Sequence, residues 1–202
     1  MAVKDHSLDD KIVKAAQEEF LENGYSKASL HKIAQKAGIT TGALYTRYKG
    51  KDDLFCSLLE GIFTVIKEKS KILEKDYMSV MKNDDPVAIL SVIKEEEKIY
   101  IDLLFDHYDS CLLLFCKSDG SSVQKLIDEM MEKKAESTVQ YLKSIAKKEI
   151  NLDGIALIME KQFSFFRCIL EKGYTREKAV SCMESIEDFL DAGWKDLFER
   201  ML

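Results

Sequence analysis

Basic and hydroxyl-bearing side chains are concentrated between Lys27 and Lys51. This segment holds six Lys or Arg residues and no Asp or Glu, although the whole chain has a formal net charge of −6. Cationic and hydroxyl side chains bind the phosphates and base edges of nucleic acids. The segment therefore predicts a DNA-binding surface, with a solvated, half-buried helix end as the alternative.

Two short helices are predicted to position these side chains. Ser29 suits the N-cap of a helix over residues 30–37, which Gly38 ends, and Thr40 suits the N-cap of a third helix from Thr41 to about Tyr48. Two helices joined by a short turn that contains glycine form a helix-turn-helix. In that motif the second helix enters the major groove with its N-terminal residues leading.

The rest of the composition favours an all-α protein of the cytoplasm. The chain has 202 residues, 46% of them hydrophobic, with one proline and five cysteines. No apolar run approaches the roughly 20 residues of a membrane span, and the first residues have no apolar segment typical of a secretory signal. An odd number of cysteines without CxxC spacing favours reduced thiols.

Helical periodicity predicts further helices along almost the whole chain. The first begins at Ser7 and ends at Gly24, and the fourth begins near Lys51 and continues through Ile72. The remaining expected features are a loop near 77–85, a helix from Pro86 to about Tyr108, the end of a buried helix before a Gly/Ser turn near 117–122, and helices over 123–148, 151–173 and 175–201.

The first 54 residues closely resemble the TetR family of transcriptional repressors. The resemblance is carried by "IVKAAQEEFLENGYSKASLHKIAQKAGITTGALYTRYKGKDDLF", and its matching positions include Phe20, Gly24, Ile33-Ala34, Ala37-Gly38, Gly42-Ala43-Leu44-Tyr45, Lys49, Lys51 and Leu54. It implies an N-terminal three-helix DNA-binding domain over 1–54 and a larger helical domain over 55–202 for effector binding and dimerisation.

The same resemblance implies a function and a set of DNA contacts. The function is that of a homodimeric repressor, which a small-molecule effector of unidentified chemistry releases from a pseudo-palindromic operator. The implied DNA-contacting residues are Ser29, Thr40, Thr41, Gly42, Tyr45, Thr46, Arg47, Tyr48, Lys49 and Lys51. Arg47 stands where many relatives carry histidine, and Tyr48 where phenylalanine is usual; both changes add hydrogen-bonding capacity.

Apolar residues after position 55 supply candidates for the effector cavity and the dimer interface. The cavity candidates, each of which could instead be ordinary core, are Phe63, Phe105, Tyr108, Phe115, Met159, Phe163 and Phe166. The interface candidates, which could instead pack inside the monomer, are Phe163, Ile186, Leu190, Gly193, Trp194 and Leu197.

Other chemistries find little support. His107 and Cys111, with Asp106 and Cys116 nearby, could be imagined as a metal site or a redox pair, but we expect these cysteines to be buried core residues. No phosphate loop or catalytic constellation is present, so we expect no enzyme, no metal and no cofactor. The alternative function is a helical small-molecule sensor without specific DNA regulation; an activator would look the same in sequence as a repressor.

Overall fold

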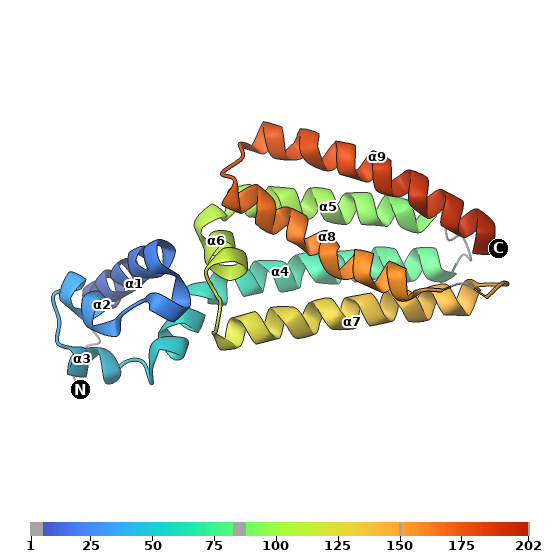
Figure 1. Ribbon diagram of the computed structural model, residues 1–202. Helices are drawn as coiled ribbons and strands as arrows, with labels where there is room; N and C mark the ends of the chain where they lie inside the picture. The colour runs from blue at the N-terminus through green and yellow to red at the C-terminus, as the bar shows by residue number, and fades with distance from the viewer. Residues whose placement is uncertain (1–5, 83–87, 150, 202) are drawn as a thin grey trace. The chain divides into compact units, whose positions relative to one another are not determined.

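The computed structural model describes residues 6–82, 88–149 and 151–201, and in these residues it contains helices and no strand (Figure 1). The all-α prediction is confirmed. The helices are α1 (His6–Lys27), α2 (Leu30–Lys36), α3 (Thr41–Tyr45), α4 (Lys51–Lys82), α5 (Ala88–Asp106), α6 (Tyr108–Cys116), α7 (Ser122–Ile145), α8 (Asp153–Glu171) and α9 (Arg176–Met201).

Several expected helix boundaries are wrong. Helix α3 ends at Tyr45 rather than near Tyr48, and α7 ends at Ile145 rather than near residue 148. Helix α4 continues to Lys82, so the loop expected from residue 77 does not begin there, and Pro86 lies outside the described residues. No Gly or Pro interrupts the chain between Gly61 and Lys82, and the hydroxyl of Tyr77 is held by a hydrogen bond to Glu96 on α5. The helix expected to run to Tyr108 ends at Asp106, and α6 begins two residues later.

The chain divides by packing into two compact units that are discontinuous in sequence. Unit 1 comprises Met1–Thr64 and Asp109–Ile127, and unit 2 comprises Val65–Tyr108 and Asp128–Leu202. This division differs from the single boundary after residue 54 that the sequence predicts. The helix α4 contributes residues to both units.

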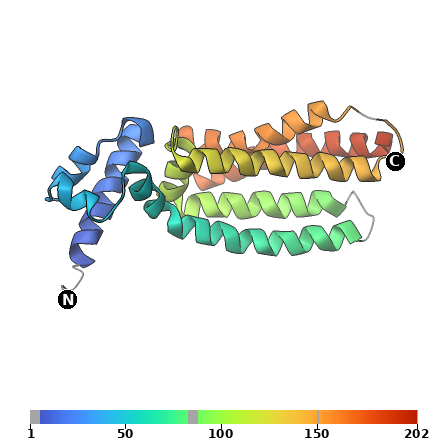
Figure 2. The ribbon, with the colours of Figure 1, turned by 90° about the horizontal axis from the view of Figure 1, so that it is seen from below.

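Unit 1 is built on the packing of α1 against α2 and of α2 against α3 (Figure 2). Phe20 of α1 and Phe55 of α4 are fully buried, with their rings edge to face and their centroids 4.9 Å apart. Leu44, the buried residue of α3, connects the third helix to this core. Aromatic pairs of this geometry contribute about 0.5–1.5 kcal/mol beyond the burial of their area.

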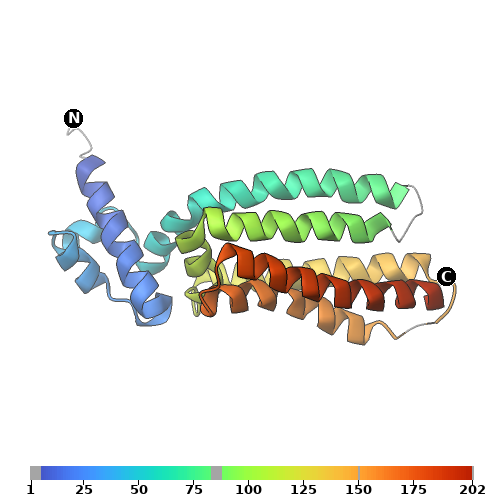
Figure 3. The same cartoon turned by 90° about the horizontal axis from the view of Figure 1, so that it is seen from above.

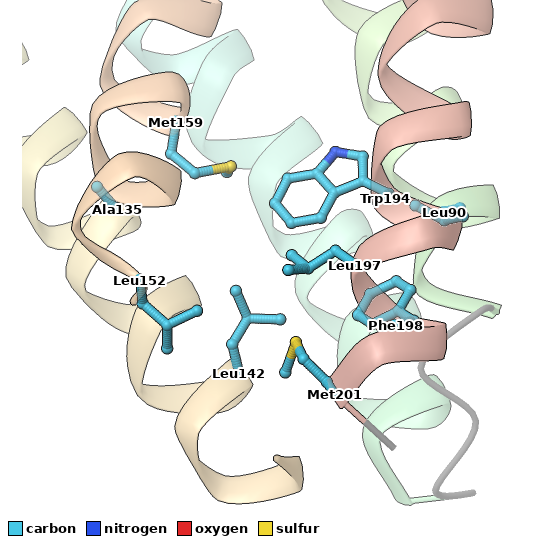
Figure 4. Packing of buried hydrophobic residues seen from close by; sticks show 9 residues of the cluster. All are labelled: Leu90, Ala135, Leu142, Leu152, Met159, Trp194, Leu197, Phe198 and Met201. Carbon is cyan, nitrogen blue, oxygen red and sulfur yellow. The ribbon is translucent and has the colours of Figure 1, made fainter. Parts of the chain in front are cut away.

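Unit 2 is a bundle in which α5 lies beside α9 and antiparallel to the later part of α4 (Figure 3). An ion pair of 2.6 Å joins Lys94 on α5 to Asp191 on α9. One cluster of buried side chains from four helices and the N-cap residue of α8 forms its core (Figure 4), and these residues are Leu90, Ala135, Leu142, Leu152, Met159, Trp194, Leu197, Phe198 and Met201. Among the described residues, none of the helices has the length and apolar character that a membrane crossing requires.

Candidate nucleic-acid interface and effector cavity

The turn between α2 and α3 is closed by local hydrogen bonds. Gly38 has a φ of 71°, a conformation that glycine adopts without the steric penalty of a Cβ atom. The next amide, that of Ile39, donates to the carbonyl of Ala34 at 3.0 Å, as in a Schellman motif. The Thr40 hydroxyl oxygen then accepts from the amide of Ala43 at 3.1 Å and caps α3, which confirms both predicted caps of the turn.

The start of α2 is fixed by a buried carboxylate. Ser29 is the N-cap, and its hydroxyl accepts from the amide of Lys32 at 3.4 Å. Its own amide donates to Oε1 of Glu19 at 3.2 Å. Glu19 is only 1% exposed, and its other carboxylate oxygen lies 3.5 Å from the ammonium of Lys36. Because both oxygens are satisfied, this charge is tolerated in the core and holds α1 against α2.

The beginning of α3 is an open surface. Tyr45 is 55% exposed, and Thr46 is exposed with its hydroxyl donating to the carbonyl of Ala43 at 2.7 Å. A Cβ atom at Gly42 would meet only the hydroxyl oxygen of Thr40, at an ordinary 3.8 Å. The described residues therefore leave room for a side chain at position 42, and its glycine keeps the backbone open to close approach.

Two of the cations expected to contact DNA have partners within unit 1. The guanidinium of Arg47 forms a 2.9 Å ion pair with Asp9 of α1. The ammonium of Lys51 donates to the carbonyl of Ser26 at 3.0 Å, near the C-terminal end of α1, and lies 4.7 Å from the centre of the Tyr25 ring. Lys51 therefore joins the beginning of α4 to the end of α1.

Other cations of the segment are open to solvent. Within the described part of the chain, Lys27, Lys32 and Lys49 are exposed and form no ion pair. The backbone amide of Lys49 donates to Asp53 at 2.8 Å, which leaves its side chain outside. Lys32, one turn after Ser29, was missed as a candidate DNA-contacting residue. Its place in the first turn of α2 could have indicated it.

A second set of hydrogen bonds ties later residues to this unit. Ser122, at the start of α7, donates from its amide and its hydroxyl to Asp52, at 2.9 Å and 2.6 Å. Burial raises the pKa of Asp52, but the hydrogen bonds from Ser122 outweigh this effect and the net pKa is lowered. The amide of Tyr25 donates to the carbonyl of Lys117 at 2.7 Å. The α6–α7 connection therefore belongs to the same packed unit as α1.

Unit 2 contains a cavity of about 240 Å³. Its lining comes from α4, α5, α7, α8 and α9, through Tyr77, Ile89, Leu90, Ile93, Glu96, Lys134, Ser137, Thr138, Tyr141, Leu142, Met159, Trp194 and Phe198. Met159 is thus both a sequence candidate and a lining residue. In Figure 4 its thioether and the Trp194 indole point toward each other.

The other aromatic candidates lie elsewhere. Phe105 contacts Tyr108 and the guanidinium of Arg176, Phe166 packs on Tyr100, and Phe63 and Phe115 belong to unit 1. The side chain of Phe163 lies outside what the structure describes.

One polar cluster stands in the otherwise apolar cavity wall. Glu96 is 7% exposed, forms an ion pair with Lys134 of α7, and accepts a 2.7 Å hydrogen bond from the Tyr77 hydroxyl. Burial, together with the Glu96 carboxylate, raises the pKa of both Tyr77 and Tyr100. Sequence reasoning missed this site, although Glu96 could have been noticed as an acid between buried positions of α5.

The interface candidates divide between the inside and the outside of the bundle. Trp194 and Leu197 are buried in the core of the chain itself, and Leu190 packs against that core. Ile186 is half-buried and Gly193 is exposed. In contrast, Phe189 is 79% exposed on α9 and Leu157 is 60% exposed on α8. Ile158, which we expected to face inward, is also exposed, because the apolar residues of α8 occupy more than one face.

The cysteines and His107 do not form a site in the described residues. No group of three or more His, Cys, Asp or Glu side chains gathers there in a way that could hold a metal ion. His107 is exposed, whereas Cys111 is fully buried, and burial raises the pKa of its thiol to about 12. Such a thiol stays protonated at neutral pH and is a poor nucleophile.

Comparison with known proteins agrees with the geometry of unit 1. Residues 12–58 match the family described as bacterial regulatory proteins, tetR family. The fatty acid metabolism regulator protein of Bacillus subtilis (strain 168) is 32% identical over 98 residues, covering 42% of this chain and 50% of that protein. The HTH-type transcriptional regulator AcrR of Shigella flexneri is 31% identical over 104 residues, covering 46% of each. The match thus spans half or less of these relatives.

Solved structures resemble the chain over almost its whole length. A TetR-like transcriptional regulator from Rhodococcus sp. RHA1 superposes with a TM-score of 0.58 at 16% identity, covering 95% of this chain and 100% of the other. FadR from Bacillus subtilis, in complex with stearoyl-CoA, gives a TM-score of 0.53 at 17% identity, covering 91% and 98%. At such identities the likeness concerns the fold. The helix-turn-helix region of the chain, residues 12–58, therefore matches the tetR family of bacterial regulatory proteins, and the fold resembles that of TetR-like regulators.

Proposed function

We propose that this protein is a ligand-responsive, DNA-binding transcriptional repressor that acts as a homodimer in the cytoplasm. A small molecule bound in the cavity of unit 2 releases the protein from a pseudo-palindromic operator. No catalytic step is part of this function. The observation that carries the proposal is the open beginning of α3, with its Thr40 cap, bare Gly42 and exposed Tyr45 in a segment without acidic residues.

The proposed DNA contacts follow from exposure. Residues at the beginning of α3, together with Tyr45 and Thr46, reach base edges and nearby phosphates in the major groove. Ser29, Lys32 and Lys49 contact the phosphate backbone from the two sides of the turn, where each cation adds affinity that depends on salt. Arg47 contributes only after it leaves Asp9, and Lys51 has a structural role.

A homodimer is supported by apolar side chains that the chain leaves uncovered. Phe189 of α9 has Ser185, Ala192 and Gly193 within a turn on the same side of the helix, and a Cβ atom at Gly193 would meet nothing. Small residues around a large exposed aromatic side chain allow close approach of another helix. A dimer presents two DNA-binding units to operator half-sites about 34–36 Å apart, or a multiple of that distance.

Release by an effector is a population shift. A ligand that binds one arrangement of the dimer more tightly than another shifts the dimer toward that arrangement. The affinity of the dimer for DNA can change by at most the ratio of the two ligand affinities. Stearoyl-CoA, which FadR of Bacillus subtilis binds, is not the ligand we propose. Its charged CoA group would meet, in the cavity wall, only a charge pair that is already neutralised.

In-vitro selection of duplex DNA from a random pool, at one fixed salt concentration, tests the proposal. The enriched sequences should form a pseudo-palindrome with regular half-site spacing. Tyr45→Ala should lose binding to the selected sequence, whereas Met130→Ala, at a 45% exposed position of α7, should retain it. Enrichment of no common sequence, with binding that depends only on salt, would refute the repressor function and leave the sensor alternative.

A further inference from the structure

The cavity of unit 2 contains two opposite charges that already neutralise each other. Glu96 and Lys134 form an ion pair across α5 and α7, and the second carboxylate oxygen of Glu96 accepts from Tyr77. A charged ligand group entering this site would lose its hydration without gaining an uncompensated partner. The lining therefore discriminates against both anions and cations.

The hydrogen-bonding groups beside this pair are hydroxyls. Ser137 and Thr138 follow Lys134 by about one turn on α7, and both line the cavity. The Thr138 hydroxyl donates its proton to the carbonyl of Lys134 at 3.0 Å, so toward a ligand it can only accept. This arrangement suits a ligand that donates one hydrogen bond, such as an alcohol or an amide.

The remaining wall is mostly apolar and offers its surface to a small ligand. Ile93, Leu142, Met159, Trp194 and Phe198 provide aliphatic and aromatic surface on the other sides. A volume of about 240 Å³ equals that of about eight water molecules in the liquid, at about 30 Å³ each. A molecule of roughly ten non-hydrogen atoms fills such a space, and its apolar part gains from leaving water.

We propose that the effector is an uncharged, mostly apolar small molecule with one hydrogen-bond donor, bound with its donor at Thr138 and its apolar part against Trp194. That this ligand regulates DNA binding rests on the proposed function. Its binding does not, because it depends only on the cavity of unit 2.

Trp194 allows binding to be measured without DNA, since it is the only tryptophan of the chain and lines the cavity. The full-length protein is titrated at pH 7 with 1-octanol, octanoate and octylammonium, three molecules of the same length that differ in charge. Saturable changes in tryptophan emission and a rise in Tm are expected with 1-octanol. Octanoate and octylammonium should bind at least tenfold more weakly. Equal or tighter binding of either ion, or no saturable response to 1-octanol, would overturn the proposal.

Variants locate the response in the cavity. Ile93→Phe fills the space, and Ser137→Phe blocks it from an exposed position that does not threaten folding; both should remove the 1-octanol response. Thr138→Val keeps the shape, removes the acceptor and should weaken 1-octanol binding about three- to tenfold. Met130→Phe, on the exposed side of α7, should bind 1-octanol as the parent does. A full response in both blocking variants would refute this location.

The two proposals fail separately. If 1-octanol binds but leaves the protein on its selected DNA, the ligand class stands and the regulatory function fails. If specific DNA is bound and 1-octanol is not, the repressor stands and the ligand class fails.

Discussion

Lys49 and Lys51 are two lysines with opposite expected roles, although the sequence pattern assigns both to DNA. The side chain of Lys49 is exposed without an ion pair among the described residues, whereas the ammonium of Lys51 donates to the carbonyls of Ser26 and Ala28, at 3.0 Å and 3.4 Å. Replacement by methionine removes each charge and keeps most of the aliphatic stem. Lys49→Met should therefore weaken DNA binding, and Lys51→Met should weaken the fold.

The magnitude for Lys51→Met follows from the contacts that it loses. Hydrogen bonds from a charged donor contribute about 1.5 kcal/mol or more to stability, and the lower value applies to a half-buried group such as Lys51. The cation over the Tyr25 ring, 4.7 Å from its centre, adds about 0.5 kcal/mol at such a site. A loss of about 2 kcal/mol lowers the Tm by about 4–8 °C in a chain of this size. Calorimetry measures this change directly.

The magnitude for Lys49→Met appears in the salt dependence. Each neutralised phosphate contributes about 0.9 to the slope of log K against log salt, so two Lys49 side chains on one operator contribute about 1.8. Between 50 and 200 mM salt, the loss in affinity should therefore be about 12-fold smaller for the variant than for the parent. Its Tm should stay close to that of the parent, since surface changes of this kind cost within about 0.5 kcal/mol.

Fluorescence anisotropy with the selected operator, measured on folded protein over this salt range, compares the variants. The reasoning is refuted if Lys51→Met reduces the salt slope as much as Lys49→Met does while its Tm is unchanged. That result would mean that Lys51 leaves the end of α1 to bind phosphate.

The remaining predictions concern a helix position, a carboxyl pair and the uncovered face of α9. Gly42→Ala should stabilise the fold by up to about 1 kcal/mol, because alanine favours helix and has room, yet it should weaken operator binding; tighter binding would contradict the external role of Gly42. Burial and the neighbouring Glu187 raise the pKa of Glu97, so the folded state keeps a proton that the unfolded chain releases, and stability should fall as pH rises above the ordinary glutamate pKa, by up to about 1.4 kcal/mol per unit. Urea unfolding between pH 5 and 9 should show this fall in the parent and a flatter profile in Glu97→Gln. Equal profiles would contradict a raised pKa of Glu97 in the folded state. Phe189→Glu should leave the fold intact but make the protein monomeric in sedimentation, with Lys195→Glu as the control; a dimer that persists would place the interface elsewhere.

The turn of the helix-turn-helix could be predicted in detail from the sequence because its interactions are local. The caps by Ser29 and Thr40 join residues three positions apart, and the left-handed conformation of Gly38 is a property of that residue. Such features depend on a few neighbouring residues, so residue type and spacing are sufficient. The same holds for the all-α class, which follows from helical periodicity and the scarcity of breakers.

The roles of individual cations could not be predicted in this way. The guanidinium of Arg47 bonds to Asp9, 38 residues away in the sequence, and the ammonium of Lys51 bonds to the carbonyl of Ser26, 25 residues away. Both partners lie on α1, and only the packing of α1 against the later helices brings them within reach. A basic run therefore indicates the kind of partner, but it does not say which of its members remain exposed.

The sequence by itself determined that this chain is helical, that it carries a helix-turn-helix with a basic surface, and which residues close its turn. Only the tertiary structure decided which apolar residues line the cavity, because aromatic and aliphatic side chains occupy several faces of α8 and α9. Trp194 lies inside and Phe189 outside on the same helix, and the cavity wall is completed by an ion pair between α5 and α7. Periodicity shows that a helix has apolar residues, whereas the contacts of one helix with its neighbours determine which of them it buries.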